Sequence, residues 1–382
     1  MHILLIITDY GSFNNFLSDL AVNMSKSGHK VDVICSSNKV IKIDDKFDYE
    51  SLGVNIHFVS FPRGFNILKQ LKASVSIHKL VVKINPDLVH IHFTTGIFTT
   101  VFYKRLPYLT IGTFHGLGYP MISGIKKYLF KTVESFCFSR LDQIYVLNKF
   151  DYDIIKGSNK KKTFMVDSAG VGCDLLKFEI DSVSLNTSDL RKQLNIDVKD
   201  FVITFTGRFV SFKGFDLVIK SFLELNRLYP SKFKLILIGG NDPIHETGLS
   251  LEEESAYLNC NNIIKVGFSN EVEKYLSISD VFLFPSLKEG MPVCIIEALA
   301  MGVPVITANS RGCNDLVFNN VNGLVLSEKP NKEEVVKALM ELQNSSNIIA
   351  EMKKYSLENR HKLGREVFID KQTEVYTKLM KL

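Results

Sequence analysis

Two glutamates frame the stretch KEGMPVCIIE (Lys288–Glu297), one before a predicted helix and one inside it. Pro292 suits the first position of a helix and Gly302 marks its end, so a short helix is predicted over PVCIIEALAMG. Glu289 would stand beside the N–H groups that open this helix, and Glu297 farther along it. One carboxylate can accept hydrogen bonds from two neighbouring hydroxyls, so the pair could grip two sugar rings. Alternatively, both are solvent-exposed acids.

Two cations, Arg208 and Lys213, lie across a predicted strand-to-helix turn in TGRFVSFKGFD. Gly207 and Gly214 would let a ligand approach the backbone, and two cations there can neutralise a diphosphate. Ligands of open α/β sheets bind where strands end, which is where both of these segments are predicted to lie. A glycine turn with solvated cations is the alternative.

The elements that must position these residues are apolar, β-rich runs separated by amphipathic stretches. In chain order the runs are HILLII, KVDVIC, NIHFVS, LVHIHF, YLTIGTF, QIYVLN and TFMVD, then FVITFTG, KLILIGG, IIKVG, VFLFPS, VPVITA and GLVL. Near-continuous apolar strands that alternate with helices are typical of parallel sheets covered on both faces. The sequence therefore predicts the α/β class, with two doubly wound domains.

The polar stretch from Asp174 to Asp200 interrupts this rhythm. We expect a first domain over 1–175, a second over 176–364 and a C-terminal helix over 365–382, for which a return to the first domain is one option. Asn331 is predicted as the N-cap of a late helix, with Glu334 completing a capping box.

Composition indicates a globular protein of 382 residues, 46% hydrophobic and 23% charged. No apolar run approaches the roughly 20 residues of a membrane span, and the opening MHILLIITDY is interpreted as a buried strand, not a signal peptide. The six scattered cysteines contain no C-x-x-C pair, which favours reduced thiols in a cytosolic protein and gives no zinc site.

The net charge of +5 is unevenly distributed. Residues 1–180 carry 22 Lys+Arg and 15 Asp+Glu, a balance of +7, and residues 181–382 carry 24 and 26, a balance of −2. A basic first half favours an anionic partner such as phosphate, nucleic acid or an acidic membrane surface.

Together the motifs resemble the retaining glycosyltransferases of family 4. The resemblance rests on the Glu289/Glu297 pair in EGMPVCIIEALAMGVPVI and on the G-R…K-G segment, with further matches in SGHKVDVI, PDLVHIH, TFHGLG and GVGCDLLKF. It implies a GT-B fold, in which two Rossmann-like domains face each other across a cleft. The N-terminal domain would bind the acceptor, and the C-terminal domain the nucleotide sugar.

The resemblance also implies residue roles. Arg208 and Lys213 would hold the diphosphate and stabilise the charge that grows as it leaves. Glu297 would accept the ribose hydroxyls, and Glu289 would bind a hydroxyl of the donor sugar. His115 would lie across the cleft, near the exocyclic position of the sugar.

Backbone contacts are expected from Gly207, from Gly290, Met291, Pro292 and Val293 to the sugar and phosphate, and from Val266, Gly267 and Phe268 to the base. Gly11 is the only glycine of the first strand-to-helix turn, TDYGSFNNF, where many family members carry a Gly-Gly pair close to the diphosphate and the acceptor. The missing G-x-G-x-x-G argues against a dehydrogenase. The stretch DSAGVGCDLLKF replaces the more usual P-N-G-V-D.

Two further patterns each have a plainer interpretation. The D-x-D of Asp151–Asp153 matches a metal–diphosphate motif, but it also suits the first turn of a helix, so no metal and no other cofactor is predicted. The basic-apolar segments Ser123–Phe136 and Phe61–Lys72 favour attachment to an anionic bilayer, although ordinary surface helices remain the alternative. His78, His90 and His92 are expected to be core or surface histidines.

The resulting prediction is a metal-independent, retaining enzyme of the cytoplasm or of the cytoplasmic face of the inner membrane. It would move a hexose or N-acetylhexosamine from a nucleotide sugar, expected to be UDP-linked, onto a polyprenyl-diphosphate-linked glycan in lipopolysaccharide, O-antigen or capsule assembly. No nucleic acid partner is expected. A sugar-nucleotide epimerase of the same architecture and a non-catalytic sugar-nucleotide or glycan-binding protein stay open as alternatives.

Overall fold

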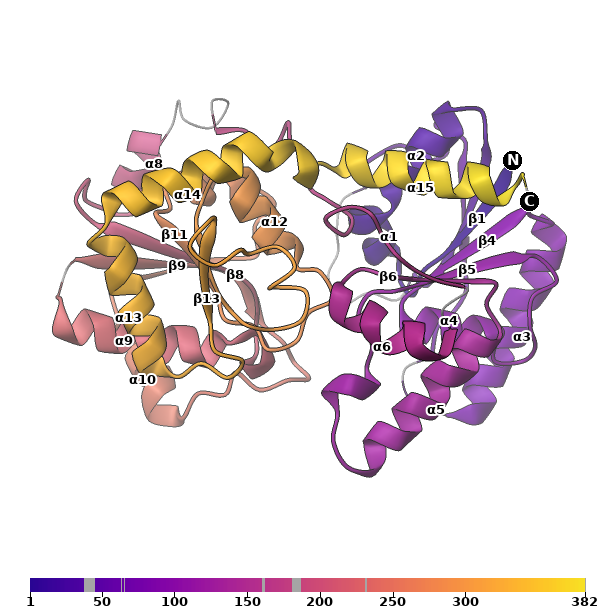
Figure 1. Cartoon of the computed structure of the whole chain (residues 1–382), viewed down its shortest axis with the longest axis horizontal. Helices are drawn as coiled ribbons and strands as arrows, with labels where there is room; N and C mark the ends of the chain where they lie inside the picture. The colour runs from indigo at the N-terminus through magenta and orange to yellow at the C-terminus, as the bar shows by residue number, and fades with distance from the viewer. Residues whose placement is uncertain are drawn as a thin grey trace. The chain divides into compact units, whose positions relative to one another are not determined.

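The chain divides into two compact units in a computed structural model that describes residues 1–37, 45–62, 64, 66–159, 162–180, 187–230 and 232–381 (Figure 1). Unit 1 comprises Met1–Val171 together with Glu366–Leu382, and unit 2 comprises Gly172–Arg365. The chain therefore begins in unit 1, builds the whole of unit 2 and returns to unit 1 with its last helix, α15 (Arg365–Leu379).

Unit 1 contains a seven-stranded sheet in the order β3-β2-β1-β4-β5-β6-β7, and every neighbouring pair is parallel. The strands are β1 (His2–Ile6), β2 (Lys30–Cys35), β3 (Val54–Phe58), β4 (Leu88–His92), β5 (Leu109–Phe114), β6 (Gln143–Val146) and β7 (Thr163–Met165). The helices besides α15 are α1 (Tyr10–Phe16), α2 (Ser18–Lys26), α3 (Ile67–Ile84), α4 (Thr94–Val101), η1 (Tyr119–Met121), α5 (Ile125–Ser139) and α6 (Lys149–Asn159).

Unit 2 contains a six-stranded parallel sheet in the order β10-β9-β8-β11-β12-β13. The strands are β8 (Phe201–Phe209), β9 (Phe233–Asn241), β10 (Ile263–Gly267), β11 (Val281–Phe284), β12 (Val305–Ala308) and β13 (Gly323–Leu326). The helices are α8 (Thr187–Gln193), η4 (Ser211–Lys213), α9 (Phe215–Leu228), α10 (Leu251–Asn259), α11 (Val272–Leu276), α12 (Val293–Ala300), α13 (Lys332–Gln343), α14 (Ser346–Asn359) and η5 (Arg360–Leu363).

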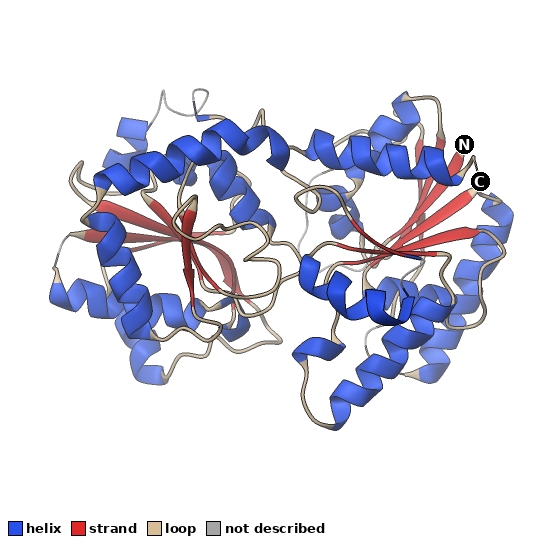
Figure 2. Cartoon of the chain, in the orientation of Figure 1, coloured by secondary structure: helices blue, strands red, loops and turns tan. Residues whose placement is uncertain are grey.

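Both sheets have the doubly wound topology that the sequence predicts, and all the predicted strands are present. Helices cover both faces of each sheet (Figure 2). Every residue of β4, β11 and β12 is buried, as expected for parallel strands that are covered on both faces. Strand order reverses between β1 and β4 in unit 1 and between β8 and β11 in unit 2. Ligands of such sheets bind at these switch points.

The predicted helix starts are close to the observed ones, with two differences. Pro292 is the N-cap of α12 and not its first helical residue. Asn331 caps α13 by accepting from the backbone N–H of Glu334 at 2.9 Å. The return arm of the capping box is missing, because the Glu334 carboxylate binds the backbone N–H and hydroxyl of Ser327 at 2.6 and 2.8 Å.

Helix α15 is fastened to unit 1 by one buried hydrogen bond and one exposed ion pair. The fully buried hydroxyl of Tyr376 lies 2.5 Å from Nδ1 of His90 on β4, and Lys371 pairs with Asp167 at 3.3 Å. All six cysteines are free thiols, as expected. Among the described residues, no helix is long and apolar enough to cross a membrane.

Candidate active site

Two loops of unit 2 meet at the switch point of its sheet. One follows β8 and contains η4, and the other follows β11 and leads into α12. The carbonyl of Phe212 in the first loop accepts from the backbone N–H of Leu287 at 3.0 Å and from the hydroxyl of Ser286 at 3.1 Å in the second. These bonds join segments that lie more than 70 positions apart in the sequence, because parallel strands end at the same edge.

Glycines make this close approach possible. Gly214 has φ +77°, and a Cβ atom there would lie 2.5 Å from the carbonyl oxygen of Pro285. Gly312, in the loop after β12, also has φ +77°, and its Cβ would lie 2.4 Å from the carbonyl oxygen of Gly290. Any larger residue at either position would push the loops apart.

Lys213 and Glu289 form an ion pair at the centre of this edge. Nζ of Lys213 lies 2.6 Å from Oε1 of Glu289, which also accepts from the Ser286 hydroxyl at 2.7 Å. Both side chains are largely buried, with 20% and 10% of their surface exposed. The ammonium group also lies over the ring of Phe284, 5.4 Å from its centroid. The ammonium group of Lys213 is therefore held in place by contacts within unit 2 alone.

The side chain of Arg208, on β8, is held by an acidic residue at the end of the neighbouring strand β9. Its guanidinium donates to Asp242, just past β9, and lies over the ring of Phe212, 5.5 Å from its centroid. The backbone N–H of Ile244 and the guanidinium hold the pKa of Asp242 well below its usual range, so this acid stays ionised. About half of the Arg208 side chain remains exposed.

Glu297 lies half-buried on α12, and its surroundings differ from those of Glu289. Burial raises the pKa of its carboxyl group to about 7, although Lys177 and Arg365 oppose the shift, and Glu273 adds to it. Its carboxylate accepts no hydrogen bond from the part of the chain that the structure describes. A ligand with two hydroxyls would supply the missing donors.

The predicted base-binding segment forms the end of β10. The pairing with β9 shifts register between Lys265 and Gly267, so Val266 is the extra residue of a bulge. Gly267 has φ +79°, and a Cβ atom there would point into open space. Phe268 is 62% exposed. Backbone groups and an aromatic ring are thus accessible at this strand end.

Gly207 and Gly290–Val293 line the same edge of unit 2. Gly207 lies within β8 with φ +152°, directly before Arg208. Arg311, which is 7% exposed, donates from Nε to the carbonyl of Glu289 at 2.7 Å and so fixes the backbone just before Gly290.

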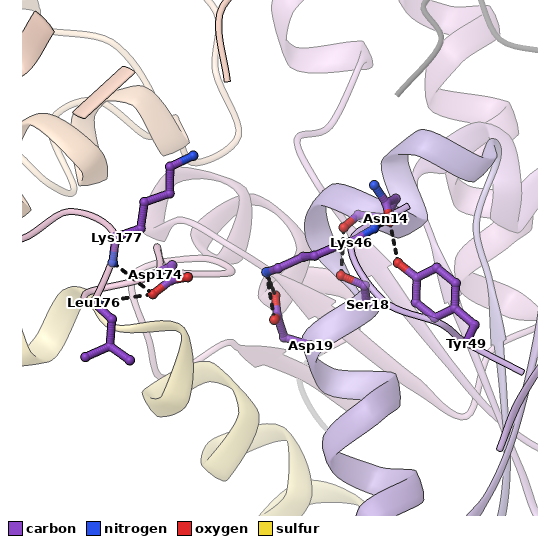
Figure 3. Close-up of polar contacts among 8 residues, drawn as sticks. All are labelled: Asn14, Ser18, Asp19, Lys46, Tyr49, Asp174, Leu176 and Lys177. Carbon is purple, nitrogen blue, oxygen red and sulfur yellow. Dashed lines mark hydrogen bonds and ion pairs between the residues drawn. The ribbon is translucent and has the colours of Figure 1, made fainter. Parts of the chain in front are cut away.

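The loop after Cys173 brings Lys177 into this neighbourhood. The Asp174 carboxylate accepts from the backbone N–H groups of Leu176 and Lys177 at 3.1 and 3.2 Å (Figure 3). Nζ of Lys177 then reaches the carbonyl of Asn270 at 2.5 Å and the carboxylate of Glu273 at 3.6 Å. The turn therefore sets the position of a cation whose field acts on Glu297.

His115 follows β5 in unit 1. Nε2 of its ring lies 3.0 Å from Nδ1 of His92, and the ring of Phe93 packs against it with centroids 4.2 Å apart. Burial lowers the pKa of His115 to about 4, so the imidazole is neutral at pH 7. Phe93 has φ +66°, a conformation that costs a bulky residue about 1–3 kcal/mol.

Gly11 is buried in the first turn of α1, whose N-cap Asp9 accepts from the backbone N–H of Ser12 at 2.9 Å. The neighbouring Tyr10 donates its hydroxyl proton to Asp45 at 2.5 Å.

A cluster of polar contacts beside this turn, buried at Asn14 and Tyr49 but exposed at Lys46, holds the chain after β2 against α1 and α2 (Figure 3). Oδ1 of Asn14 accepts from the backbone N–H of Lys46 at 3.0 Å and from the hydroxyl of Tyr49. Nζ of Lys46 binds both oxygens of Asp19 at 2.7 Å. The turn that carries Gly11 is thus braced by residues that no motif singles out.

The D-x-D motif serves the fold of unit 1. Asp151 is fully buried and accepts from the backbone N–H of Leu117 at 3.1 Å, whereas Asp153 is exposed and pairs with Lys149 and Lys156 at 3.0 and 2.7 Å. Among the described residues, no group of three or more His, Cys, Asp or Glu could hold a metal ion. His78 is buried, with Nε2 3.1 Å from the carbonyl of Thr100.

Comparison with known proteins places these observations in a family. The profile described as Glycosyltransferase Family 4 matches residues 14–161, and the profile described as Glycosyl transferases group 1 matches residues 186–359. The chain belongs to glycosyltransferase family 4. Its two doubly wound units are those of the GT-B fold, as the sequence predicts.

Two relatives and one solved structure illustrate the range of similar proteins. The chain is 28% identical to a UDP-Gal:alpha-D-GlcNAc-diphosphoundecaprenol alpha-1,3-galactosyltransferase of Escherichia coli, over 73% of this chain and 72% of that protein. It is 26% identical to an N,N'-diacetylbacillosaminyl-diphospho-undecaprenol alpha-1,3-N-acetylgalactosaminyltransferase of Campylobacter jejuni, over 76% and 77%. Sucrose-phosphate synthase of Thermosynechococcus elongatus aligns over 100% of both chains with a TM-score of 0.79 and 17% identity, which shows a shared fold.

Sequence reasoning missed three residues that shape this glycosyltransferase. Asp242 anchors Arg208, Arg311 fixes the backbone at Glu289, and Lys177 lies close to Glu297. Asp242 and Arg311 each follow shortly after an apolar strand, β9 and β12, and that position could have marked them. Lys177 lies in the matched segment GVGCDLLKF but carries no signal of its own.

Proposed function

We propose that this glycosyltransferase transfers a hexose or N-acetylhexosamine from a UDP-sugar to a sugar–diphosphate–polyprenol, with retention of the α-configuration. The observation that carries the proposal is the group formed by Lys213, Glu289 and Arg208 at the switch point of unit 2, with Glu297 on the helix that starts there. This group has the chemistry to bind a nucleotide diphosphate. Both named relatives act on diphosphoundecaprenol-linked sugars, which supports the acceptor class.

The donor would lie along the carboxyl edge of the unit 2 sheet. The base would meet the backbone of Val266–Phe268, the ribose hydroxyls would bind the carboxylate of Glu297, and the diphosphate would lie between Arg208 and Lys213. Oε1 of Glu289 is occupied by Lys213 and Ser286, so Oε2 is the oxygen that would accept from a hydroxyl of the donor sugar. His115 would contact the sugar from unit 1, which would receive the acceptor.

Catalysis would consist mainly of charge stabilisation. As the bond to the diphosphate breaks, the leaving group gains negative charge and the sugar becomes oxocarbenium-like. Lys213 and Arg208 are fixed in advance by their acid partners, so little reorganisation is needed when this charge develops. The acceptor hydroxyl would attack from the face that the diphosphate leaves, which retains the anomeric configuration without a covalent enzyme intermediate and without a metal ion.

The acceptor would be met at the cytoplasmic face of the membrane. Helix α5 exposes Ile125, Tyr128 and Leu129, with Lys126, Lys127 and Lys131 beside them. Helix α3 begins with exposed Ile67 and Leu68. Apolar side chains between lysines suit an anionic bilayer. Arg63 and Phe65 of the second predicted basic-apolar segment lie outside the described residues.

A thermal-shift panel tests the donor assignment. UDP-, GDP- and ADP-sugars are each compared with the free nucleoside diphosphate, and we expect one UDP-sugar to raise the midpoint above UDP itself. That UDP-sugar is then incubated with a synthetic GlcNAc-diphosphate-lipid, and formation of an α-linked product completes the test. Release of a free, epimerised sugar nucleotide would favour the epimerase alternative, and stabilisation without product would favour a binding protein.

A further inference from the structure

The loop that follows β5, HGLGYP, is held from behind by a buried carboxylate of α5. Glu134 is 0% exposed. Oε1 accepts from the backbone N–H of Gly118 at 2.7 Å, and Oε2 accepts from that of Tyr119 at 3.3 Å. The hydroxyl of Thr94, at the start of α4, adds a third donor at 3.4 Å.

A second buried carboxylate, that of Asp151, accepts a hydrogen bond from the backbone N–H of the preceding loop residue, Leu117. Asp151, at the start of α6, is also 0% exposed, and its Oδ2 accepts from the backbone N–H of Leu117 at 3.1 Å and from the amide of Asn148 at 3.0 Å. Three successive N–H groups, those of residues 117, 118 and 119, therefore end on two carboxylates that come from two different helices.

The glycines of this loop fit the same arrangement. Gly116 has φ +126°, which only glycine adopts readily. A Cβ atom on Gly118 would lie 2.8 Å from the ring of Phe130 and 3.3 Å from Oε1 of Glu134, so α5 can approach the loop only because position 118 has no side chain. The glycine at position 118 is thus explained by the close approach of α5, and the glycine at position 116 by its positive φ.

Burying a carboxylate is costly unless hydrogen bonds compensate, and a fold that needed only to fill this space would use apolar side chains. Glu134 forms no ion pair with any residue that the structure describes, and burial raises the pKa of its carboxyl group although the N–H groups of Gly118 and Tyr119 oppose the shift. The carboxylate therefore has one evident task, which is to fix the loop backbone.

His115 lies directly before this loop and is fixed on its other side as well. Its ring is bonded to His92 and covered by Phe93, whose strained backbone aims the ring at the imidazole. Backbone strain of this kind persists only where the surroundings over-determine the conformation. The imidazole thus lies between an aromatic neighbour and the start of a loop whose backbone is bonded to two buried carboxylates.

We propose that Glu134 and Asp151 are positioning residues, two buried carboxylates that clamp the backbone of Leu117–Tyr119 and so hold His115 where it meets the donor sugar. The proposal rests on the proposed function for the role of His115. The carboxylates themselves touch neither donor nor acceptor. They act through the loop, and one of them ties the loop to α5.

The test compares Glu134→Gln and Asp151→Asn with Ser74→Ala as a matched control. Ser74 is also buried in unit 1 and also accepts a backbone N–H, that of Tyr103 at 2.9 Å, but it supports no part of the site. Each amide variant keeps the shape of the side chain while replacing one acceptor oxygen by a donor. We expect kcat to fall about 10- to 100-fold in Glu134→Gln, in line with the sensitivity of rates to misplaced groups. The UDP dissociation constant should change less than about twofold, because the donor cations and Glu297 belong to unit 2.

A double-mutant comparison then asks whether Glu134 acts through His115. In a His115→Ala background, Glu134→Gln should lower kcat by no further factor, since the group that it positions is already gone. A multiplicative loss, or wild-type kcat in both amide variants, would overturn the proposal. If instead His115→Ala itself keeps full kcat, the role of His115 in the proposed function is wrong, which is a separate failure.

Amide hydrogen exchange measures how firmly the two carboxylates hold the loop backbone, and it does so without an activity assay. Peptides covering residues 116–121 should exchange at least about tenfold faster in Glu134→Gln than in wild type, while the same peptides in Ser74→Ala stay at the wild-type rate. Unchanged exchange in both amide variants would show that the carboxylates do not hold the loop.

Discussion

Each of the two cations expected at the diphosphate already has an acid partner within unit 2. Lys213 pairs with Glu289, and Arg208 with Asp242. A side chain that is fixed in this way loses little conformational freedom when a ligand binds, and it keeps further N–H donors for phosphate oxygens. In the proposed function, the acids would therefore hold the cations in position for the charge that develops as the diphosphate leaves.

Replacing Lys213 by Ala should mainly lower turnover. Since its ammonium would stabilise charge that grows in the transition state, we expect kcat to fall about 10²- to 10³-fold, with a smaller change in the donor KM. Steady-state kinetics with the matched UDP-sugar measures both constants. Lys234→Ala is the control, because Lys234 lies near the start of β9, at the opposite end of the sheet from the carboxyl edge, and donates to the side chain of Asn262 at 2.8 Å. Equal kcat in both variants would remove Lys213 from the diphosphate site.

Glu297 should make donor binding depend on pH. Burial raises the pKa of Glu297 to about 7, so the carboxylate form, which would accept hydrogen bonds from the ribose hydroxyls in the proposed function, predominates only above pH 7. We expect the dissociation constant of the UDP-sugar to fall about tenfold from pH 6 to pH 8, following the ionised fraction. Calorimetry with a UDP-sugar is suitable, because its diphosphate has no group that titrates in this range. Glu297→Gln should bind more weakly and show a flat profile, and a retained slope would assign the titration to another group.

At the scale of elements, the sequence predicts the strands, the doubly wound topology and the turns that carry Arg208, Lys213 and Glu289. These depend on apolar runs and on glycine and proline signals, which are local. The Lys213–Glu289 and Arg208–Asp242 pairs join residues far apart in the chain, and no local pattern contains them. The same holds for Asp151, whose type and position suit a helix start equally well as a loop anchor.

The exposed lysines of helix α5 are predicted to contribute to binding at an anionic membrane surface. Replacing Lys126, Lys127 and Lys131 together by Ser should reduce binding to vesicles containing anionic lipid, because each lysine near such a surface contributes about 1 kcal/mol. Vesicle sedimentation measures the bound fraction. The control replaces Lys337, Lys353 and Lys354, exposed lysines of α13 and α14 in unit 2, by Ser. If both triple variants lose binding equally, net charge and not α5 explains it.

At the scale of the whole molecule, unit 1 contains buried histidines that should make it sensitive to acid. Burial lowers the pKa of His90 to about 3 and that of His115 to about 4, and it lowers the pKa of His92 well below its ordinary value. An unfolded chain binds a proton on each near pH 6.5, and the folded unit does not. Below pH 6.5 the unfolded state therefore binds more protons than the folded unit. The free energy of unfolding unit 1 consequently decreases as the pH is lowered through that range.

The free energy of opening β4 and β5 should accordingly fall between pH 6.5 and pH 5.5 by about 1 kcal/mol for each of these histidines. Hydrogen exchange of the strand amides, corrected for the intrinsic rate at each pH, measures this free energy. His92→Gln should reduce this pH-dependent decrease in the free energy of opening by about the contribution of one histidine. His361→Gln, at an exposed position in unit 2, should leave it unchanged. A wild-type free energy that is constant over this interval would contradict the prediction.

The return of α15 to unit 1 has a consequence for the order in which the protein forms. Unit 1 is built from two stretches of chain with all of unit 2 between them, so a ribosome releases a complete unit 2 before it releases the helix that carries Tyr376. Domains usually mature from the N-terminus during synthesis, but here the second unit can finish first. Until α15 emerges, the buried face around His90 lacks its cover, and that interval is when a nascent chain of this protein would most need a chaperone.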